Sequence, residues 1–257
     1  LLARQGGSYA LTPKASGLLD ELSDLLDRAK LVVEAESDFN PLSSDREFRL
    51  MCSDYAAVVI GSELSNRLAS SLPHGRLRLV SMEPHAASRF ESVARRFDGL
   101  VLPRGILGSA PALDLLTDEW VCVADAASDV GNGGRLTVEE ARRSQWVLTY
   151  LGQETQGPGF ELLLKTFKIE PRVTVVCESY LAVPSLVIGS DRLALCQSRL
   201  AREYVRTKHL KILQPPVPVR PINLAMWWSP QLDKDPGHQW FRHLVAETAS
   251  RLAEVAS

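Results

Sequence analysis

The feature that most constrains the fold is an alternation of strand-like and helix-like segments, which starts near residue 46. A strand is expected at 47–53 and a helix at 54–72. A second strand at 76–82 and a second helix at 87–97 lead to a third strand at 98–103. This third segment, DGLVLP, is apolar without alternation, as expected of a parallel strand that is covered on both faces. The β-α-β-α-β order predicts a right-handed, doubly wound parallel sheet.

A second series of the same kind begins at residue 118. Its strands are expected at 118–125, 145–150, 172–179, 191–197 and 210–216. Helices are expected among them at 136–144, 155–167 and 180–189, and Thr137 with Glu140 predicts a capping box at the start of the first. The predicted fold class is therefore α/β with two similar lobes.

The end of the chain determines how the lobes are connected. A strand expected at 221–230 and an amphipathic helix at 237–256 suit a return of the chain to the first lobe. The chain would then pass between the lobes two times. Lobe I would comprise 46–118 and 220–257, and lobe II would comprise 119–219.

The first residues follow another pattern. Residues 1–12 predict a short hairpin, because Gly6-Gly7 is a two-residue turn signal between LLARQ and SYALT. A helix is expected to follow, since Thr12 can cap its first turn and Pro13 suits the first helical position. The polar segment 37–45 has no periodicity and predicts a linker.

The helix over 13–37 carries an apolar seam whose steps of four and three residues are typical of a coiled coil. Its members are Leu18, Leu22, Leu25, Ala29 and Val32. The seam predicts dimerisation through this helix. The alternative is an amphipathic helix that packs on its own domain.

Bulk properties exclude some classes of protein. A net charge of −2 gives no support for a broad nucleic-acid surface. No run of about 18 apolar residues exists, so no membrane span is expected. No secretory segment is evident, and the four cysteines lie in apolar stretches, which favours buried thiols in a reducing cytoplasm.

Catalytic and metal-binding motifs are missing from the sequence. It has no G-x-S-x-G elbow, H-E-x-x-H pair or phosphate-binding loop, so an enzyme is not expected. The histidines and cysteines lack the spacing of zinc ligands. We therefore expect no metal and no other cofactor.

The stretch Leu11-Thr12-Pro13-Lys14-Ala15 resembles the end of the winged helix-turn-helix domain of LysR-type transcription regulators. In that family a wing hairpin leads through an L-T-P-x-G/A stretch into a dimerising linker helix. The segments that follow match the family's order: REFRLMCSDY, RFDGLVLP, EWVCVAD, VVCESYLAVPSLVIGSDRLALCQSRLA and LAMWWSP. The part GSDRLALCQSRLA is most similar to the nodulation-regulator-like branch, which has Gly-Thr-Asp-Arg where Ser190 stands here.

The resemblance covers essentially the whole chain and implies a truncated member of the family. Residues 1–12 would be a remnant of the winged domain, 13–37 the linker helix, and 46–257 a two-lobed, periplasmic-binding-protein-like (type 2) effector domain. The implied partners are a small aromatic or carboxylate effector between the lobes, a second copy of the chain in a dimer or tetramer, and DNA. DNA would be bound through the largely missing domain, and Arg4 and Gln5 of the wing are expected to touch phosphate only weakly.

The candidate effector-binding residues of lobe I follow the carboxyl ends of its strands, where helix starts offer free N–H groups. Ser53 and Tyr55 follow the first strand, and Pro103 and Arg104 end the third. Arg104 can pair with a carboxylate through two hydrogen bonds. The alternatives are helix capping by Ser53 and a solvated Arg104. Asp54 is not assigned to binding, because its charge would repel an anionic effector.

The candidates of lobe II lie in two polar segments after strands. Thr149, Gln153 and Thr155 belong to a glycine-containing loop that can cradle a polar group, and Ser179 precedes an expected helix. The alternatives are an ordinary surface loop and simple capping.

Three functions are compatible with these predictions. The leading one is a ligand-responsive transcription regulator. A solute-binding protein for transport would have the same two lobes, and a dimeric interaction module would need no effector. The wing-like hairpin with its coiled-coil helix favours the regulator, because a transport protein has no reason to carry either.

Overall fold

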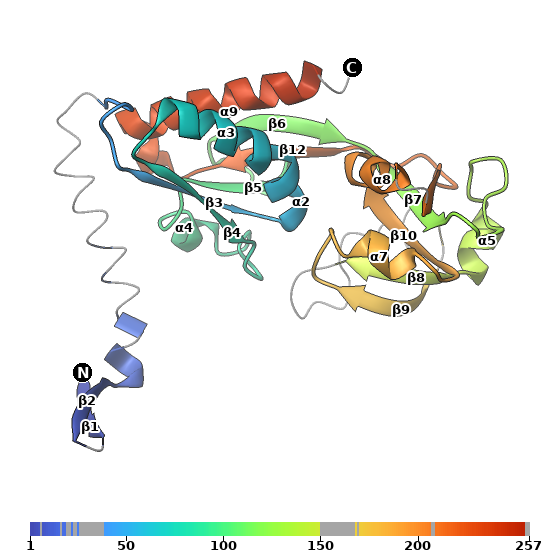
Figure 1. Cartoon of the computed structure of the whole chain (residues 1–257), viewed down its shortest axis with the longest axis horizontal. Helices are drawn as coiled ribbons and strands as arrows, with labels where there is room; N and C mark the ends of the chain where they lie inside the picture. Colours follow the sequence, from blue (N-terminus) through green and yellow to red (C-terminus); the bar gives the residue numbers. More distant parts are fainter. Residues whose placement is uncertain are drawn as a thin grey trace.

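The computed structural model contains two α/β lobes, each built on a five-stranded sheet (Figure 1). It describes residues 1–5, 7–15, 17, 18, 22, 25, 39–149, 168, 170–206 and 209–254. The chain passes from the first sheet to the second near residue 119 and returns between residues 213 and 222. The predicted two-lobed α/β fold with two crossings is confirmed.

The sheet of lobe I has the strand order β4-β3-β5-β12-β6. Its strands are β3 (Glu47–Cys52), β4 (Arg76–Ser81), β5 (Gly99–Pro103), β6 (Ala112–Asp118) and β12 (Ile222–Trp227). β3 is parallel to β4 and β5, as the alternation predicts, whereas β12 is antiparallel to both β5 and β6. β6 therefore runs in the same direction as β3, β4 and β5, and β12 alone runs the opposite way. The sheet is mixed, and the prediction of a purely parallel sheet is wrong for β12.

No strand was predicted from the sequence in the region of β6. Its sequence, ALDLLTD, is dominated by alanine, leucine and aspartate, which have low strand propensity by themselves. Pairing with β12 along six registered positions makes it a strand. The predicted strand 118–125 corresponds to β7 (Trp120–Asp125), which begins two residues after β6 ends.

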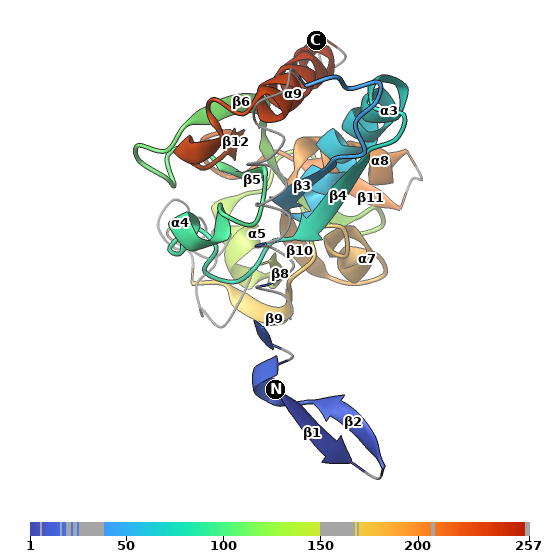
Figure 2. The same cartoon turned by 90° about the vertical axis from the view of Figure 1, so that its left-hand side faces the viewer.

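The helices of lobe I cover both faces of its sheet. α2 (Asp54–Ala56), a π-helical turn η1 (Ala57–Gly61) and α3 (Ser62–Ser71) form the helical stretch predicted at 54–72. Figures 1 and 2 show α3 and the C-terminal helix α9 (Pro236–Glu254) on one side of the sheet and α4 (Phe90–Val93) on the other. α4 is much shorter than the helix predicted at 87–97, because turns flank it.

The sheet of lobe II has the order β11-β7-β10-β8-β9. Besides β7 it contains β8 (Gln145–Thr149), β9 (Arg172–Cys177), β10 (Arg192–Gln197) and β11 (Leu210–Leu213). Its helices are α5 (Val138–Arg143), α7 (Val183–Val187) and α8 (Ser198–Val205). The helix expected at 155–167 lies outside the described residues.

One apolar cluster runs through both lobes. It contains Phe48 and Leu64 of lobe I together with Val123 and Val183 of lobe II. Each lobe has a further cluster of its own on the other face of its sheet. The lobes are therefore packed against each other at one side rather than joined by the crossings alone.

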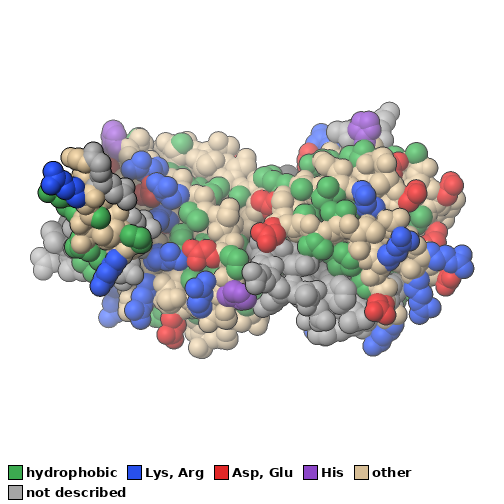
Figure 3. All heavy atoms as spheres, turned by 90° about the horizontal axis from the view of Figure 1, so that it is seen from below, with side chains coloured by type: hydrophobic (Ala, Val, Ile, Leu, Met, Phe, Trp, Pro, Cys, Tyr) green, Lys and Arg blue, Asp and Glu red, His purple; other side chains and the backbone are tan. Residues whose placement is uncertain are grey.

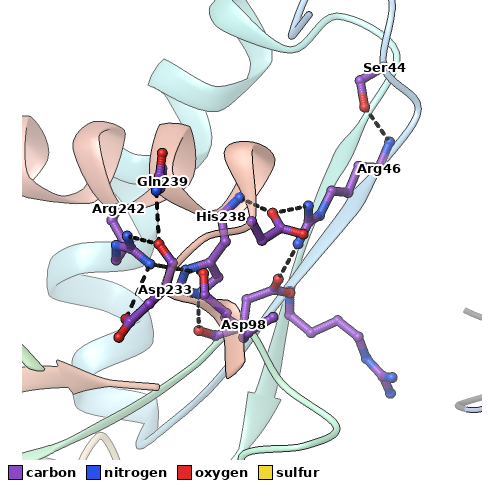
Figure 4. A network of polar contacts seen from close by, with 10 residues as sticks. Ser44, Arg46, Asp98, Asp233, His238, Gln239 and Arg242 are labelled. Atoms are coloured by element: carbon purple, nitrogen blue, oxygen red, sulfur yellow. Dashed lines mark hydrogen bonds and ion pairs between the residues drawn. The ribbon is translucent and has the colours of Figure 1, made fainter. Parts of the chain in front are cut away.

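A buried polar network attaches α9 to lobe I (Figure 4). Arg46 forms ion pairs with Asp98 at 3.1 Å and Asp235 at 2.7 Å. Nε2 of His238 lies 2.7 Å from the backbone oxygen of Asp98, and its Nδ1 lies 2.7 Å from Nη1 of Arg242. Since Arg242 can only donate, Nε2 carries the proton and His238 is neutral. Burial, above all, lowers the pKa of His238 from its ordinary value.

The N-terminal hairpin pairs β1 (Leu2–Gln5) with β2 (Ser8–Leu11), as predicted. The backbone N–H of Ala15 donates to Oγ1 of Thr12 at 3.2 Å, which confirms the predicted cap. Helical residues follow at 13–15, 17, 18, 22 and 25. Ala29 and Val32 of the predicted seam lie outside the described residues.

The cysteines are unpaired thiols. Cys52, Cys122 and Cys196 are buried and Cys177 is half-buried, so the prediction of four buried thiols is wrong for Cys177. Burial raises the pKa of Cys52 to about 11 and that of Cys122 to about 12, so both remain protonated at neutral pH. Within the described ranges, no helix is long and apolar enough to cross a membrane. The same ranges hold no group of metal-ligating side chains.

Candidate functional site

The two lobes contact each other through the carboxylate of Asp54, which lies directly after β3. In lobe II, the hydroxyl of Ser179 donates to Oδ2 of Asp54 at 2.7 Å, and the backbone N–H of Leu181 donates to the same oxygen at 3.1 Å. The backbone N–H of Tyr180 donates to Oδ1 at 3.2 Å, and that of Tyr55 does so at 2.8 Å. Each carboxylate oxygen thus accepts two hydrogen bonds, and three of the four donors belong to lobe II.

Two of the predicted site residues, Ser53 and Ser179, lie at this contact. Oγ of Ser53 accepts a hydrogen bond from the N–H of Ala56 at 3.2 Å, with Ser53 in the extended conformation of an N-cap. Oγ of Ser179 accepts from the N–H of Ala182 at 3.1 Å while it donates to Asp54, but the N-cap of α7 is Ala182 itself. The capping alternative is therefore present for Ser53, whereas Ser179 stabilises the turn before α7.

A second polar contact lies beside the first crossing between the lobes. The hydroxyl of Tyr55 donates to Oδ2 of Asp118 at the end of β6, and this oxygen also accepts from the backbone N–H of Arg199 at 3.3 Å. Oδ1 accepts from the N–H of Glu119 at 2.8 Å. The side chain of Tyr55 is 1% exposed, and this burial, together with Asp118, raises the pKa of its phenol. Tyr55 therefore remains a proton donor.

A cavity of about 550 Å³ lies between η1 of lobe I and α8 of lobe II, next to Tyr55. This volume is in the usual range for small-molecule sites. The apolar part of its wall consists of Tyr55, Val58, Val59, Leu181 and Leu200. The polar part consists of Thr117, Asp118, Glu119, Ser198, Arg199, Arg202 and Glu203. Three carboxylates against two guanidinium groups give the wall no excess of positive charge.

The space-filling view from below shows acidic side chains where the two lobes meet, while Lys and Arg side chains are spread over both lobes (Figure 3). Arg199 is occupied by another partner, since both of its terminal nitrogens lie 3.4 Å from the backbone oxygen of Leu252 in α9. The junction between the lobes is thus more acidic than a site for an anion requires.

The predicted residues Thr149 and Ser179 lie on neighbouring segments of lobe II. Thr149 pairs with Cys177 across β8 and β9, and Oγ1 of Thr149 lies 4.0 Å from Sγ of Cys177. The thiol of Cys177 donates to the backbone oxygen of Ser179 at 3.4 Å. Gln153 and Thr155 lie outside the described residues.

The side chain of Arg104 is directed along lobe I. Its Nε forms an ion pair with Asp114 at 2.8 Å, and its guanidinium lies 5.3 Å from the centre of the Trp227 ring. Pro103 ends β5 opposite Leu224. The contacts of Arg104 within the described part of the chain are all with lobe I, so the structure does not bring it to Asp54 or Ser179.

Sequence reasoning missed Asp54 and Asp118. Asp54 was set aside because its charge was weighed only against an anionic ligand and not against N–H donors of the other lobe. Both acids lie at the carboxyl end of a strand, since Asp54 comes two residues after the end of β3 and Asp118 is the last residue of β6. Only β3 was predicted from the sequence, so this signal could have identified Asp54 but not Asp118.

The residues predicted to contact DNA and a second copy lie at the N-terminus. Arg4 is exposed on β1, where it pairs with Tyr9. The side chain of Gln5 is not among those described. In the helix, the side chains of Leu22 and Leu25 are 52% and 64% exposed, whereas Leu18 is half-buried.

Comparison with known proteins gives this architecture a family. The family profile described as "LysR substrate binding domain" matches residues 43–250. The chain belongs to the LysR family. As a LysR protein it is a transcription regulator and not an enzyme, which confirms both predictions.

Similar LysR-type sequences include two nodulation proteins. Nodulation protein D 2 of Rhizobium meliloti (strain 1021) is 30% identical over 255 residues, which are 98% of this chain and 80% of that protein. Nodulation protein D 2 of Rhizobium leguminosarum bv. phaseoli is 29% identical over 254 residues, with 98% and 79% covered. The predicted resemblance to the nodulation-regulator-like branch of the LysR family is confirmed.

A solved structure supports the same assignment. The probable transcriptional regulator PA0477 from Pseudomonas aeruginosa is 25% identical and superposes with a TM-score of 0.82, over 96% of this chain and 81% of its own. Among the three functions considered from the sequence, this favours the LysR regulator over the transport protein.

Proposed function

We propose that this chain is part of a ligand-responsive LysR-type transcription regulator and binds a small effector between its two lobes. The observation that carries the proposal is the cavity of about 550 Å³, whose wall comes from η1 and Tyr55 of lobe I and from α8 of lobe II. An effector shifts a conformational equilibrium only if it binds one arrangement better than another. A ligand that touches both lobes meets this requirement, because its contacts change whenever the lobes move.

The effector is proposed to be small and to be aromatic or to carry a carboxylate. Tyr55, Val59 and Leu200 supply apolar contact area for an aromatic body. The proposed contacts are the residues predicted from the sequence: Ser53, Tyr55, Pro103, Arg104, Thr149, Gln153, Thr155 and Ser179. Of those that the structure describes, Tyr55 alone lines the cavity, while Ser53 and Ser179 lie at the neighbouring contact of Asp54. Arg104 would have to exchange Asp114 for the effector.

The proposed organisation has three parts. Residues 1–12 belong to a winged domain, 13–37 form a dimerising helix, and 46–257 form the effector domain, with lobe II at 119–219. DNA would be bound through the winged domain, to which Arg4 and Gln5 make only a weak contribution.

Self-association is proposed through the helix at 13–37. The exposed side chains of Leu22 and Leu25 support it, because a second copy of the helix would bury these apolar side chains away from water. Light scattering should give the mass of a dimer or tetramer for the whole chain and a smaller assembly after deletion of residues 1–36. A monomer before and after the deletion would reject the proposed helix contact.

Effector binding is tested by a thermal-shift panel of benzoate, chlorobenzoate, benzamide and a flavone. A ligand at a hundred times its Kd stabilises the folded state by about 2.7 kcal/mol, which raises the melting temperature. For a compound that binds, Val59→Phe should weaken the calorimetric affinity about tenfold or more, because the ring fills the cavity. Ser53→Ala and Arg104→Ala should weaken it as well.

Val176→Phe is the matched control, since Val176 is exposed on β9 and does not line the cavity. Equal affinity in the wild type, Val59→Phe and Val176→Phe would place the ligand elsewhere. Unchanged affinity in Ser53→Ala and Arg104→Ala would remove those two residues from the site.

A further inference from the structure

We propose that Asp54 is a built-in carboxylate ligand of lobe II and that it selects against effectors carrying an anionic group at this position. The inference rests on the proposed function, because it assumes that effectors enter between the lobes. It leads to different expectations for aromatic effectors and for effectors with a carboxylate. An aromatic effector without charge is accepted, whereas one that binds through a carboxylate has to displace Asp54.

The geometry gives Asp54 the place of a bound anion. Ser179, Tyr180 and Leu181 present one hydroxyl and two backbone N–H groups, and all three point at one carboxylate. This set of donors is typical of sites that hold an external carboxylate. Here the carboxylate belongs to lobe I, 125 residues away from Ser179 along the chain. The donors are therefore occupied before any ligand arrives.

The charges around the cavity act in the same direction. The cavity wall carries the acidic side chains of Asp118, Glu119 and Glu203, and Asp54 lies beside its wall residues Tyr55 and Leu181. Of the two cations in the wall, Arg199 donates to Leu252, so Arg202 is left to offset the repulsion of an incoming carboxylate. Like charges a few ångströms apart destabilise each other strongly when they are shielded from water.

The proposal predicts that removal of the carboxylate creates a binding site for an anion. In Asp54→Ala the three donors of lobe II lose their partner and gain the space that the carboxylate filled. An external carboxylate then replaces the missing one. In Asp54→Asn the size is kept and the charge is lost, so the repulsion falls while part of the hydrogen bonding remains.

Hydrogen exchange, followed by mass spectrometry on the peptide that contains residues 180 and 181, tests this directly. In the wild type both amides are protected by Asp54. In Asp54→Ala they should exchange roughly tenfold faster, because local opening no longer breaks a hydrogen bond to a charged group. Benzoate should slow the exchange again in Asp54→Ala and have no effect on the wild type. Benzamide has the same shape without the charge. It should change the exchange at residues 180 and 181 equally in Asp54→Ala and in the wild type.

Asp129→Asn is the matched control. Asp129 is exposed in lobe II, and its replacement removes the same charge without touching the contact between the lobes. Exchange at residues 180 and 181 should be unchanged in this variant, with or without benzoate. If Asp54→Ala does not fold, Asp54→Asn tests the loss of the charge, since exchange at residues 180 and 181 should rise in this variant too, by less than tenfold.

Two results would overturn the proposal. One is unchanged exchange at residues 180 and 181 in both Asp54 variants, which would mean that the contact does not hold the loop. The other is that benzoate slows the exchange at residues 180 and 181 in the wild type as much as in Asp54→Ala, or slows it in neither protein. These results differ from a failure of the proposed function. In that case no compound would bind the wild type in a way that Val59→Phe weakens, while the exchange in Asp54→Ala would still rise.

Discussion

Two polar networks centre on carboxylates in this molecule, one inside lobe I and one between the lobes. Inside lobe I, Arg46 lies between Asp98 and Asp235, and the side chains of Arg46 and Asp98 are only 11% and 12% exposed. Between the lobes, Asp54 faces a hydroxyl and two backbone N–H groups of a loop. The first network joins fixed charges of opposite sign, whereas the second joins a charge to neutral donors.

The difference indicates which part of the molecule can move. Separating the partners of a buried ion pair leaves a buried charge without compensation, which costs several kcal/mol of free energy. The network of Arg46 therefore holds α9 rigidly on lobe I. Neutral N–H donors can exchange a carboxylate for water or for a ligand at a smaller cost. The contact of Asp54 is therefore the kind that opens, and lobe I is expected to move as one body around it.

Breaking the inner network gives the largest expected effect. Arg46→Ala leaves Asp98 and Asp235 without their cation and should lower the free energy of unfolding by about 3 kcal/mol, measured by urea denaturation. Arg143→Ala is the control, because Arg143 forms an exposed ion pair with Glu139 and should cost about 0.5 kcal/mol or less. Similar losses in the two variants would show that burial does not distinguish the networks.

The contact of Tyr55 with Asp118 is expected to rank second. Tyr55→Phe removes a buried hydroxyl that donates to a carboxylate and should cost about 2 kcal/mol in the same experiment. Tyr9→Phe serves as the control, since Tyr9 is exposed in the hairpin and its loss should be within about 0.5 kcal/mol. A loss for Tyr55→Phe no larger than for Tyr9→Phe would remove this contact from the lobe junction.

The smallest expected effect is the pH dependence of the inner network. His238 is buried and neutral, between Arg242 and the backbone of Asp98, and its pKa is lowered from the ordinary 6.5. The unfolded chain therefore binds a proton more readily than the folded one below pH 6.5. The stability that neutral His238 contributes is complete above that pH and is lost as the pH falls through the folded pKa, by at most about 1.4 kcal/mol for each pH unit.

Urea denaturation at pH 7.5 and at pH values below about 6.5 measures this loss. His238→Gln should be less stable at neutral pH but should lose less on acidification than the wild type. His74→Gln is the control, because His74 is exposed and its replacement should leave the pH dependence as it is. An identical pH dependence in the wild type and His238→Gln would contradict a buried neutral histidine.

The predictions that succeeded from the sequence depend on residues close together in the chain. Thr12 caps the first helix, and Thr137 with Glu140 forms the predicted capping box of α5. The apolar segments of both lobes became strands near their predicted places, because periodicity and burial are readable within a few residues. The family followed from the order of such segments.

The predictions that failed or were missing depend on partners far away in the chain. β6 becomes a strand through β12, which lies more than a hundred residues further along. Arg104 was expected to face a ligand, and its place beside Asp114 and Trp227 follows from the pairing of β5, β12 and β6. No local pattern carries this information.

The sequence by itself determined that this LysR protein has two α/β lobes and an N-terminal hairpin followed by a capped helix start, since each of these is a property of local periodicity, turns and caps. Only the tertiary structure decided that Asp54 of one lobe meets Ser179, Tyr180 and Leu181 of the other. The physical reason is that a carboxylate selects its partners by distance and direction, which the chain sets only once both lobes have folded. The residue set aside from the sequence for its charge is, in the structure, one of those that join the lobes.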